Sequence, residues 1–219
     1  MNKLNNPVYI KRLSLLCSLT YLAGYLTRVN FAAVVVAIID ETGWEKSDIS
    51  AATTALFVAY GIGQLISGWL GDRLKPERII SVGLISSAVL NLLIPLCSSI
   101  SQMTVVWAAN GLAQAMLWPP IVRILTSACH RKDYQNATVV VSWGSSVGTI
   151  LTFIIASACT SFFGWRVVFV ICSLCAFAAS AVWIAGFSKI RDYSLGDENR
   201  ALAARVDDKP QDNPTRGAE

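Results

Sequence analysis

The sequence predicts an all-α membrane protein with six transmembrane helices. Of its 219 residues, 54% are hydrophobic and only 15% are charged, which is a low charged fraction for a soluble protein. The hydrophobic residues come in blocks of about 20, the length that a helix needs to cross a bilayer. Lys and Arg residues lie at the ends of these blocks, as expected of segments that orient in a membrane.

The six apolar blocks are joined by short polar segments. The blocks cover residues 13–39, 51–70, 79–96, 105–125, 137–158 and 167–187. Ser47, ahead of the second block, is expected to cap that helix. Residues 1–188 are therefore predicted to form one transmembrane domain. Residues 189–219 are polar and are expected to form a cytoplasmic tail, or the start of an interdomain linker, without a fold of its own.

The basic residues are unevenly shared between the two sides of the predicted bundle. The side that would hold both chain ends carries Lys3, Lys11, Arg12, Arg73, Lys75, Arg78, Arg131, Lys132, Lys189 and Arg191. The opposite side carries only Lys46 and Arg166. The positive-inside rule then places both ends in the cytoplasm of a multi-pass protein of the cell (inner) membrane. The long first block has no small-residue cleavage site, so it is interpreted as a retained helix in contact with membrane lipid.

Several functions are not supported by the composition. The formal charge of +4 forms no continuous basic stripe, so no nucleic-acid partner is expected. Six cysteines are scattered through apolar segments and are interpreted as small buried residues, without a metal site or a disulfide. No carboxylate pair, nucleophile with a base, or ligand cluster occurs at membrane depth, so we expect neither an enzyme nor a cofactor.

An arginine lies in the middle of the first block, in the stretch Tyr25–Phe31. Arg28 would cost between about 3 and more than 10 kcal/mol if it faced lipid. It is therefore expected to face the protein interior or a water-filled cavity, which predicts a ligand site. The alternative is an arginine that extends to the outer head groups or pairs with helix carbonyls.

The turn between the second and third blocks, residues 68–78, combines glycine, acid and base. Gly68 would let a neighbouring helix approach closely. Asp72 can accept charge-assisted bonds from a basic residue or from helix N-terminal amides, forming a latch whose loss would open the inner face. The alternative is a polar turn that only satisfies the positive-inside rule. The spacing Gly-x-x-x-Asp-Arg followed by basic residues resembles the signature loop of the major facilitator superfamily of transporters.

Two further stretches resemble one branch of that family, the organophosphate:phosphate antiporters. They are residues 25–31 and the fourth-block segment 110–123, which contains Trp118-Pro119-Pro120-x-x-Arg123. Physically, the two prolines remove amide donors and are expected to bend or break the helix near its cytoplasmic end, or only to end it. The resemblance assigns gating roles to Gly68, Asp72, Arg73, Arg78, Trp118, Pro119, Pro120 and Arg123.

The resemblance also implies a substrate site. In that branch the first-span arginine meets the substrate phosphate, a role that falls here to Arg28. Gln64 stands where the phosphate transporters have a lysine, and Ser145 where they have a histidine; both can donate neutral hydrogen bonds. With a single cation, a singly charged organic anion is favoured over a doubly charged phosphate. The substrate-binding set expected from the resemblance is Tyr25, Arg28, Asn30, Gln64, Gln114 and Ser145.

Members of the family have twelve spans in two halves, each half built as a 3+3 inverted repeat. This chain resembles the amino-terminal half. It is expected to be a truncated or split transporter half that works with a second six-helix half or by self-association. The implied function is secondary active transport of a small organic anion, an organophosphate or carboxylate, by alternating access. The alternative is a non-transporting sensor or remnant of the same family.

Overall fold

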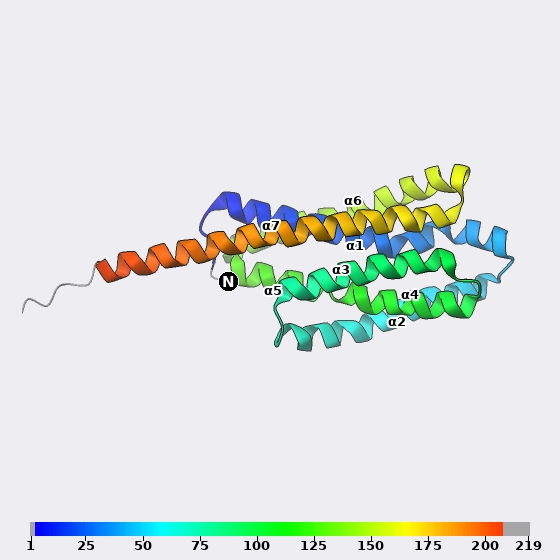
Figure 1. The fold of residues 1–219 in the computed structure, drawn as a ribbon, viewed down its shortest axis with the longest axis horizontal. Coiled ribbons are helices and arrows are strands. Elements are labelled where there is room, and N and C mark those ends of the chain that lie inside the picture. Colours follow the sequence, from blue (N-terminus) through cyan, green and yellow to red (C-terminus); the bar gives the residue numbers. More distant parts are fainter. Residues whose placement is uncertain (1–2, 208–219) are drawn as a thin grey trace, which may run out of the picture.

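The computed structural model describes residues 3–207, and within them every regular element is a helix (Figure 1). The all-α prediction is confirmed. In chain order the elements are α1 (Pro7–Thr42), α2 (Lys46–Gly71), α3 (Pro76–Leu93), the short 3₁₀ helix η1 (Ile94–Leu96), α4 (Ile100–Ala115), α5 (Trp118–Ala128), α6 (Arg131–Phe163) and α7 (Trp165–Asp207).

Helix α1 has well-defined caps at both ends. The side chain of Asn6 accepts the backbone N–H of Val8 at 2.9 Å, and Pro7 occupies the first turn, where no amide partner is needed. At the other end Gly43 has φ of 69° and donates its N–H to the carbonyl of Ile39 at 2.9 Å. This left-handed conformation favours glycine. It ends α1 and turns the chain toward α2.

The expected cap of α2 is wrong. The helix begins at Lys46, and the N-cap residue is Glu45, which makes no side-chain cap bond. Ser47 therefore lies inside the first turn, and its hydroxyl donates to Glu45 Oε2 at 3.0 Å. The helix starts earlier than the apolar block because its first turn is solvated and needs no apolar residues.

The fourth crossing is interrupted, as the two prolines predicted. Helix α4 ends at Ala115, four residues before Pro119, because the proline ring would clash with that carbonyl. The N–H groups of Met116 and Leu117 bond three residues back, to Ala113 and Gln114, before α5 begins. Five helices of the described chain are long and apolar enough to span a membrane. The remaining crossing, the fourth in chain order, is made by α4 and α5 together.

Helix α7 continues well past the predicted end of the last block. It runs to Asp207 and projects beyond the rest of the bundle (Figure 1). Ile190 and Ser194 are buried, and the rings of Tyr193 and Tyr9 stack with their centres 3.6 Å apart. The last helix therefore extends to Asp207, into the segment expected to form a tail or linker. The remainder of that predicted segment, residues 208–219, lies outside the described residues.

The packing follows the predicted 3+3 pattern. Helix α1 packs most extensively on α6, α4 on α2, and α3 on α7. In an inverted repeat, the first three crossings correspond to the last three. The α1–α6 pair is then equivalent to the α4–α2 pair, and the α3–α7 pair is equivalent to itself. Both exchanged pairs use glycine for close approach: a Cβ on Gly144 would lie 2.3 Å from the Ser18 carbonyl oxygen, and one on Gly111 2.3 Å from that of Leu56.

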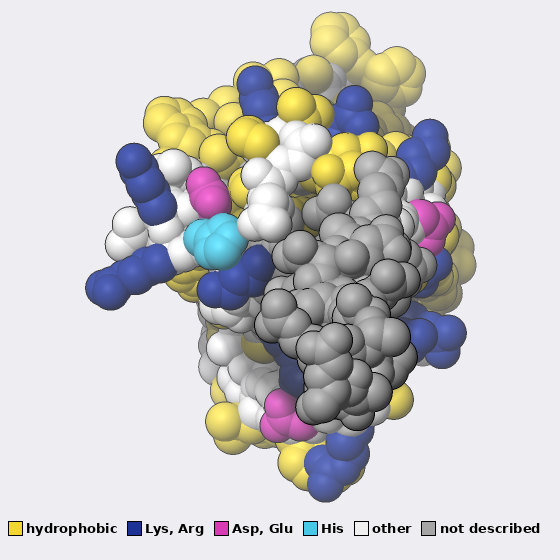
Figure 2. Space-filling view, turned by 90° about the vertical axis from the view of Figure 1, so that its left-hand side faces the viewer, with side chains coloured by type: hydrophobic (Ala, Val, Ile, Leu, Met, Phe, Trp, Pro, Cys, Tyr) yellow, Lys and Arg dark blue, Asp and Glu magenta, His cyan; other side chains and the backbone are white. Residues whose placement is uncertain are grey.

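The two ends of the bundle differ in charge. Helix α1 begins and α7 extends at the same end (Figure 1). Viewed from that end, Lys and Arg side chains gather around the rim (Figure 2). At the other end, an ion pair between Arg166 and Glu41 joins the start of α7 to the end of α1. The sides between the ends carry many exposed apolar residues, as a lipid-facing surface should.

Candidate functional site

A cavity of about 460 Å³ opens between α1, α2 and α4. On α1 it is lined by Tyr21, Tyr25, Arg28 and Ala32, whose spacing of four, three and four residues places them on one helical face. The opposite wall is formed by Thr53, Phe57 and Tyr60 of α2 and by Trp107 of α4. The cavity is therefore largely aromatic and holds one cation.

Arg28 lies among tyrosine rings. Its guanidinium carbon is 4.2 Å from the ring centre of Tyr25 and 5.2 Å from that of Tyr60, which are cation–π distances. Across the described residues no carboxylate forms an ion pair with Arg28, and no backbone carbonyl accepts a hydrogen bond from it. The cavity wall includes no acidic residue. The donors of the guanidinium are thus available to an anion that enters the cavity.

The tyrosines are held in place by their neighbours. Gln64 Nε2 donates to the hydroxyl of Tyr60 at 2.6 Å, so Gln64 positions a wall residue and does not line the cavity. Tyr21 packs edge-on against Tyr25, and also lies 5.1 Å, centre to centre, from Trp118 at the start of α5. A displacement of α5 would therefore be transmitted directly to the cavity wall.

Two residues expected at the substrate site lie instead in a buried group of hydrogen-bonded side chains. Asn30 and Gln114 are buried in a polar network that joins α1, α3 and α4. The other members are Thr27, Ser87, Asn91 and Asn110, and none of the six is more than 2% exposed. This group is called the polar network below.

Hydrogen bonds in the polar network converge on Thr27. Its carbonyl accepts Asn91 Nδ2 at 3.0 Å and Asn110 Nδ2 at 2.9 Å. Its hydroxyl accepts Gln114 Nε2 at 2.9 Å and the Ser87 hydroxyl at 3.0 Å. Asn30 Nδ2 donates to Asn91 Oδ1 at 2.7 Å. Thr27 is thus bonded from both α3 and α4, which fixes the rotation of α1 about its own axis. Because successive residues on a helix point about 100° apart, the neighbouring Arg28 is turned toward the cavity.

Ser145 does not reach the cavity. Its hydroxyl donates to the carbonyl of Ser142 on the same helix at 2.7 Å, and it is absent from the cavity wall. Helix α6 places Gly144 and Gly148 against α1, which directs the neighbouring Ser145 along a different face. The hydroxyl groups of the cavity wall are those of three tyrosines and Thr53.

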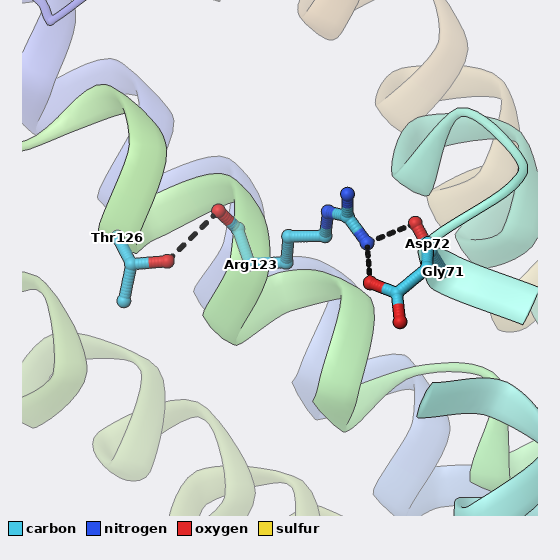
Figure 3. A network of polar contacts seen from close by, with 4 residues as sticks. All are labelled: Gly71, Asp72, Arg123 and Thr126. Atoms are coloured by element: carbon cyan, nitrogen blue, oxygen red, sulfur yellow. Dashed lines mark hydrogen bonds and ion pairs between the residues drawn. The ribbon is translucent and has the colours of Figure 1, made fainter. Parts of the chain in front are cut away.

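At the basic end, Asp72 makes the charge-assisted bond that the sequence predicted. Arg123 Nη1 lies 2.8 Å from Asp72 Oδ1, and the same nitrogen donates to the carbonyl of Gly71 (Figure 3). Thr126 Oγ1 donates to the carbonyl of Arg123 at 3.0 Å one turn further along α5. The contact joins the end of α2 to α5, directly after the break in the fourth crossing.

The other residues expected to act in gating lie in several different environments. Gly68 is exposed, and a Cβ there would meet no atom within 4 Å, so no helix of the described chain makes the close approach expected at this glycine. Arg73 stacks on Trp69, with 3.7 Å between the guanidinium carbon and the ring centre. Pro119 and Pro120 lie in the first turn of α5. Arg78 is exposed in the first turn of α3.

Sequence reasoning missed Tyr21, Thr53, Tyr60 and Trp107 as cavity residues. Tyr21 shares the helical face of Arg28, so its spacing alone would have indicated it. The other three are contributed by α2 and α4, and which face of those helices meets α1 depends on packing that the sequence pattern does not contain.

The chain belongs to the Major Facilitator Superfamily, whose family model matches residues 17–210. Among solved structures it resembles the bacterial homologue of the human lysosomal transporter Spinster in an inward-facing, unoccupied conformation. The TM-score is 0.76 at 19% identity, over 83% of this chain and 44% of that one. At this level of identity the likeness concerns the fold.

Curated relatives include transporters and a sensor. A probable hexose phosphate transport protein of Chlamydia trachomatis is 28% identical over 68% of this chain and 32% of its own length. The glycerol-3-phosphate transporter of Bacillus subtilis is 30% identical, over 68% and 34%. The membrane sensor protein UhpC of Escherichia coli is 28% identical, over 68% and 34%. The matched part spans about a third of the length of each of these relatives.

Proposed function

We propose that this chain forms one half of a secondary active transporter and binds a small organic anion at Arg28. The observation that carries the proposal is the guanidinium of Arg28, which lies in an aromatic cavity without a carboxylate partner. A cation at membrane depth without a counter-ion is costly, and an anionic substrate would supply the missing charge.

The anion is either a phosphate ester or a carboxylate. Relatives named as hexose phosphate and glycerol-3-phosphate transporters favour an organophosphate. A guanidinium binds either group through two parallel hydrogen bonds. The hydroxyls of Tyr21, Tyr25 and Tyr60 can add neutral bonds, and the aromatic wall suits the organic part of the substrate. Because Arg28 is the one cation of the cavity wall, a singly charged anion fits it better than a doubly charged one.

Transport by alternating access requires a second wall. The cavity is bounded by α1, α2 and α4 on one side, and we propose that a second six-helix unit, or a second copy of this chain, closes it on the other. The ion pair of Asp72 with Arg123 acts as the latch that holds α5 to α2 when the inner side is closed. With the basic end in the cytoplasm, the protein lies in the cell (inner) membrane with α1 beginning on the cytoplasmic side.

A second candidate function is sensing. The relatives include two proteins named as membrane sensor UhpC, 28% and 27% identical to this chain. A sensor would bind the same anion at Arg28 without moving it. Uptake into liposomes that contain the protein and its second unit separates the two functions, because a sensor binds the anion but produces no accumulation.

The test of the site is Arg28→Lys. Guanidinium offers a planar fork of donors, whereas ammonium is a compact and strongly hydrated point charge. Loss of a buried charge-assisted contact costs about 2 to 5 kcal/mol, so we expect anion affinity to fall more than about tenfold. Titration calorimetry in detergent, with a panel of phosphorylated and carboxylated solutes, measures this loss.

Arg12→Lys is the matched control. Arg12 also lies over a tyrosine ring of α1, 5.3 Å from the centre of Tyr9, but outside the cavity. Its replacement should leave affinity unchanged. If Arg28→Lys binds the anion as well as the parent chain, Arg28 is a structural residue and the proposed site is wrong.

A further inference from the structure

A second pocket, of about 520 Å³, lies at the basic end between the α2–α3 turn and the break in the fourth crossing. Its walls are apolar and include Leu74, Val82 and Met116. Leu74 and Val82 are 51% and 54% exposed. The pocket therefore presents uncovered hydrocarbon surface at the level where the bundle meets the head groups.

Three cations belong to the wall of this pocket: Arg73, Lys75 and Arg78. None of them forms an ion pair across the part of the chain whose side chains are described. Asp72, the nearest acid in sequence to Arg73, is bonded to Arg123. Glu77 is then the one further acid of the turn, so the three cations leave the turn with a net positive charge. The guanidinium of Arg73 lies over the ring of Trp69, so at least one of the three cations is positioned in advance.

An apolar pocket with a basic rim is complementary to an anionic phospholipid, which has an apolar acyl chain and a negatively charged head group. Basic pockets between transmembrane helices bind anionic head groups, and the cytoplasmic leaflet supplies anionic lipid. The long side chains of Arg and Lys can lie along apolar surface with their charges at the head-group level. The Lys and Arg side chains on the rim of this end (Figure 2) add a favourable field.

We propose that this pocket binds one anionic phospholipid from the leaflet at the basic end. The phosphate interacts with Arg73, Lys75 and Arg78, and an acyl chain lies against Val82 and Met116. Met116 lies between the end of α4 and the start of α5, so the bound acyl chain would contact the break itself. The site is separate from the Arg28 cavity, with which it shares no wall residue.

Native mass spectrometry of the full chain in detergent tests this site, with phosphatidylglycerol and phosphatidylcholine of identical acyl chains as probes. We expect one tightly retained phosphatidylglycerol and no comparable phosphatidylcholine. A cation near a head group is worth about fivefold in binding, so Lys75→Gln with Arg78→Gln should weaken retention about 25-fold. The matched control, Arg131→Gln with Lys132→Gln, removes the same charge at the same end and should change retention little.

A further variant tests the apolar part of the site. Val82→Trp fills the pocket and should reduce retention by at least the same factor, while Val89→Trp, on the same face of α3 two turns away and also exposed, should not. Soluble glycerol phosphate should not compete. Equal retention of both lipids, equal losses in both double variants, or displacement by glycerol phosphate would each overturn the proposal, the last by showing a plain anion site.

Discussion

At the scale of single residues, helical rotation decides which polar side chain faces the cavity and which is buried against other helices. Thr27, Arg28 and Asn30 lie within four positions of one another on α1. Arg28 faces the cavity, whereas Thr27 and Asn30 are buried against α3 and α4. The polar network therefore acts as the support that orients the cation, and its loss should be detectable as lost stability.

Asn91→Leu tests this support. Asn91 donates to the carbonyls of Thr27 and Ser87 and accepts a bond from Asn30. An apolar replacement of similar size leaves the buried Asn30 amide without its acceptor and removes one donor from each of the two carbonyls, so we expect the free energy of unfolding to fall by about 1 to 3 kcal/mol. Thermal unfolding in detergent measures the change. Thr54→Val removes an exposed hydroxyl that bonds only its own helix and should have almost no effect; equal effects of the two variants would contradict a structural role for the network.

At the scale of helices, the fourth crossing is divided into two parts held by different contacts. Helix α4 packs on α2 through Gly111, while α5 is held to the end of α2 by Arg123. The side chains of Arg123 and Asp72 are 45% and 78% exposed, and exposed ion pairs contribute at most about 1 kcal/mol. Such a contact is weak enough to break during the alternating access proposed above.

Asp72→Asn should therefore affect transport more than stability. The amide keeps the shape of the side chain but loses the charge-assisted bond. We expect unfolding to change by less than about 1 kcal/mol, and uptake into liposomes containing the complete transporter to fall. Arg123→Gln should have the same effect, and the double variant should be no worse than either alone. Uptake equal to that of the parent chain would make Asp72 only a polar turn residue.

At the scale of the whole molecule, the charge difference between the two ends predicts orientation. Lys46 begins α2, and Lys75 is the N-cap of α3, in the turn that follows the other end of α2, so the two provide a direct test. After replacement of the six native cysteines, Lys46→Cys should react with an impermeant maleimide on intact cells, and Lys75→Cys only after permeabilisation. Reaction of both from one side would contradict the orientation.

Much of this architecture could be predicted from the sequence because bilayer thickness sets the length of apolar blocks. The broken fourth crossing was also predictable, because Pro119 and Pro120 lie inside an apolar block and cannot donate the hydrogen bonds that a continuous helix would need there. The extension of α7 beyond Phe187 was not, because its sequence is mostly polar, and the burial of Ile190 and the stacking of Tyr193 depend on packing against the start of α1. The roles of Asn30 and Gln114 were not predictable either. Each is a polar residue at membrane depth, and only the packing of α3 against α1 and α4 shows that their partners are other side chains.

The polar network also bears on how the chain enters the membrane. Asparagine and threonine groups without partners are unfavourable in hydrocarbon, and α1, α3 and α4 each bring such groups. The bonds from Asn91 to Thr27 and from Asn30 to Asn91 involve α1 and α3 only. These two helices can therefore pair as soon as both have left the translocation machinery, before α4 follows them into the bilayer. Asn110 and Gln114 of α4 then find Thr27 and Ser87 already in place, so the order of synthesis is also an order in which unpaired polar groups are removed from lipid.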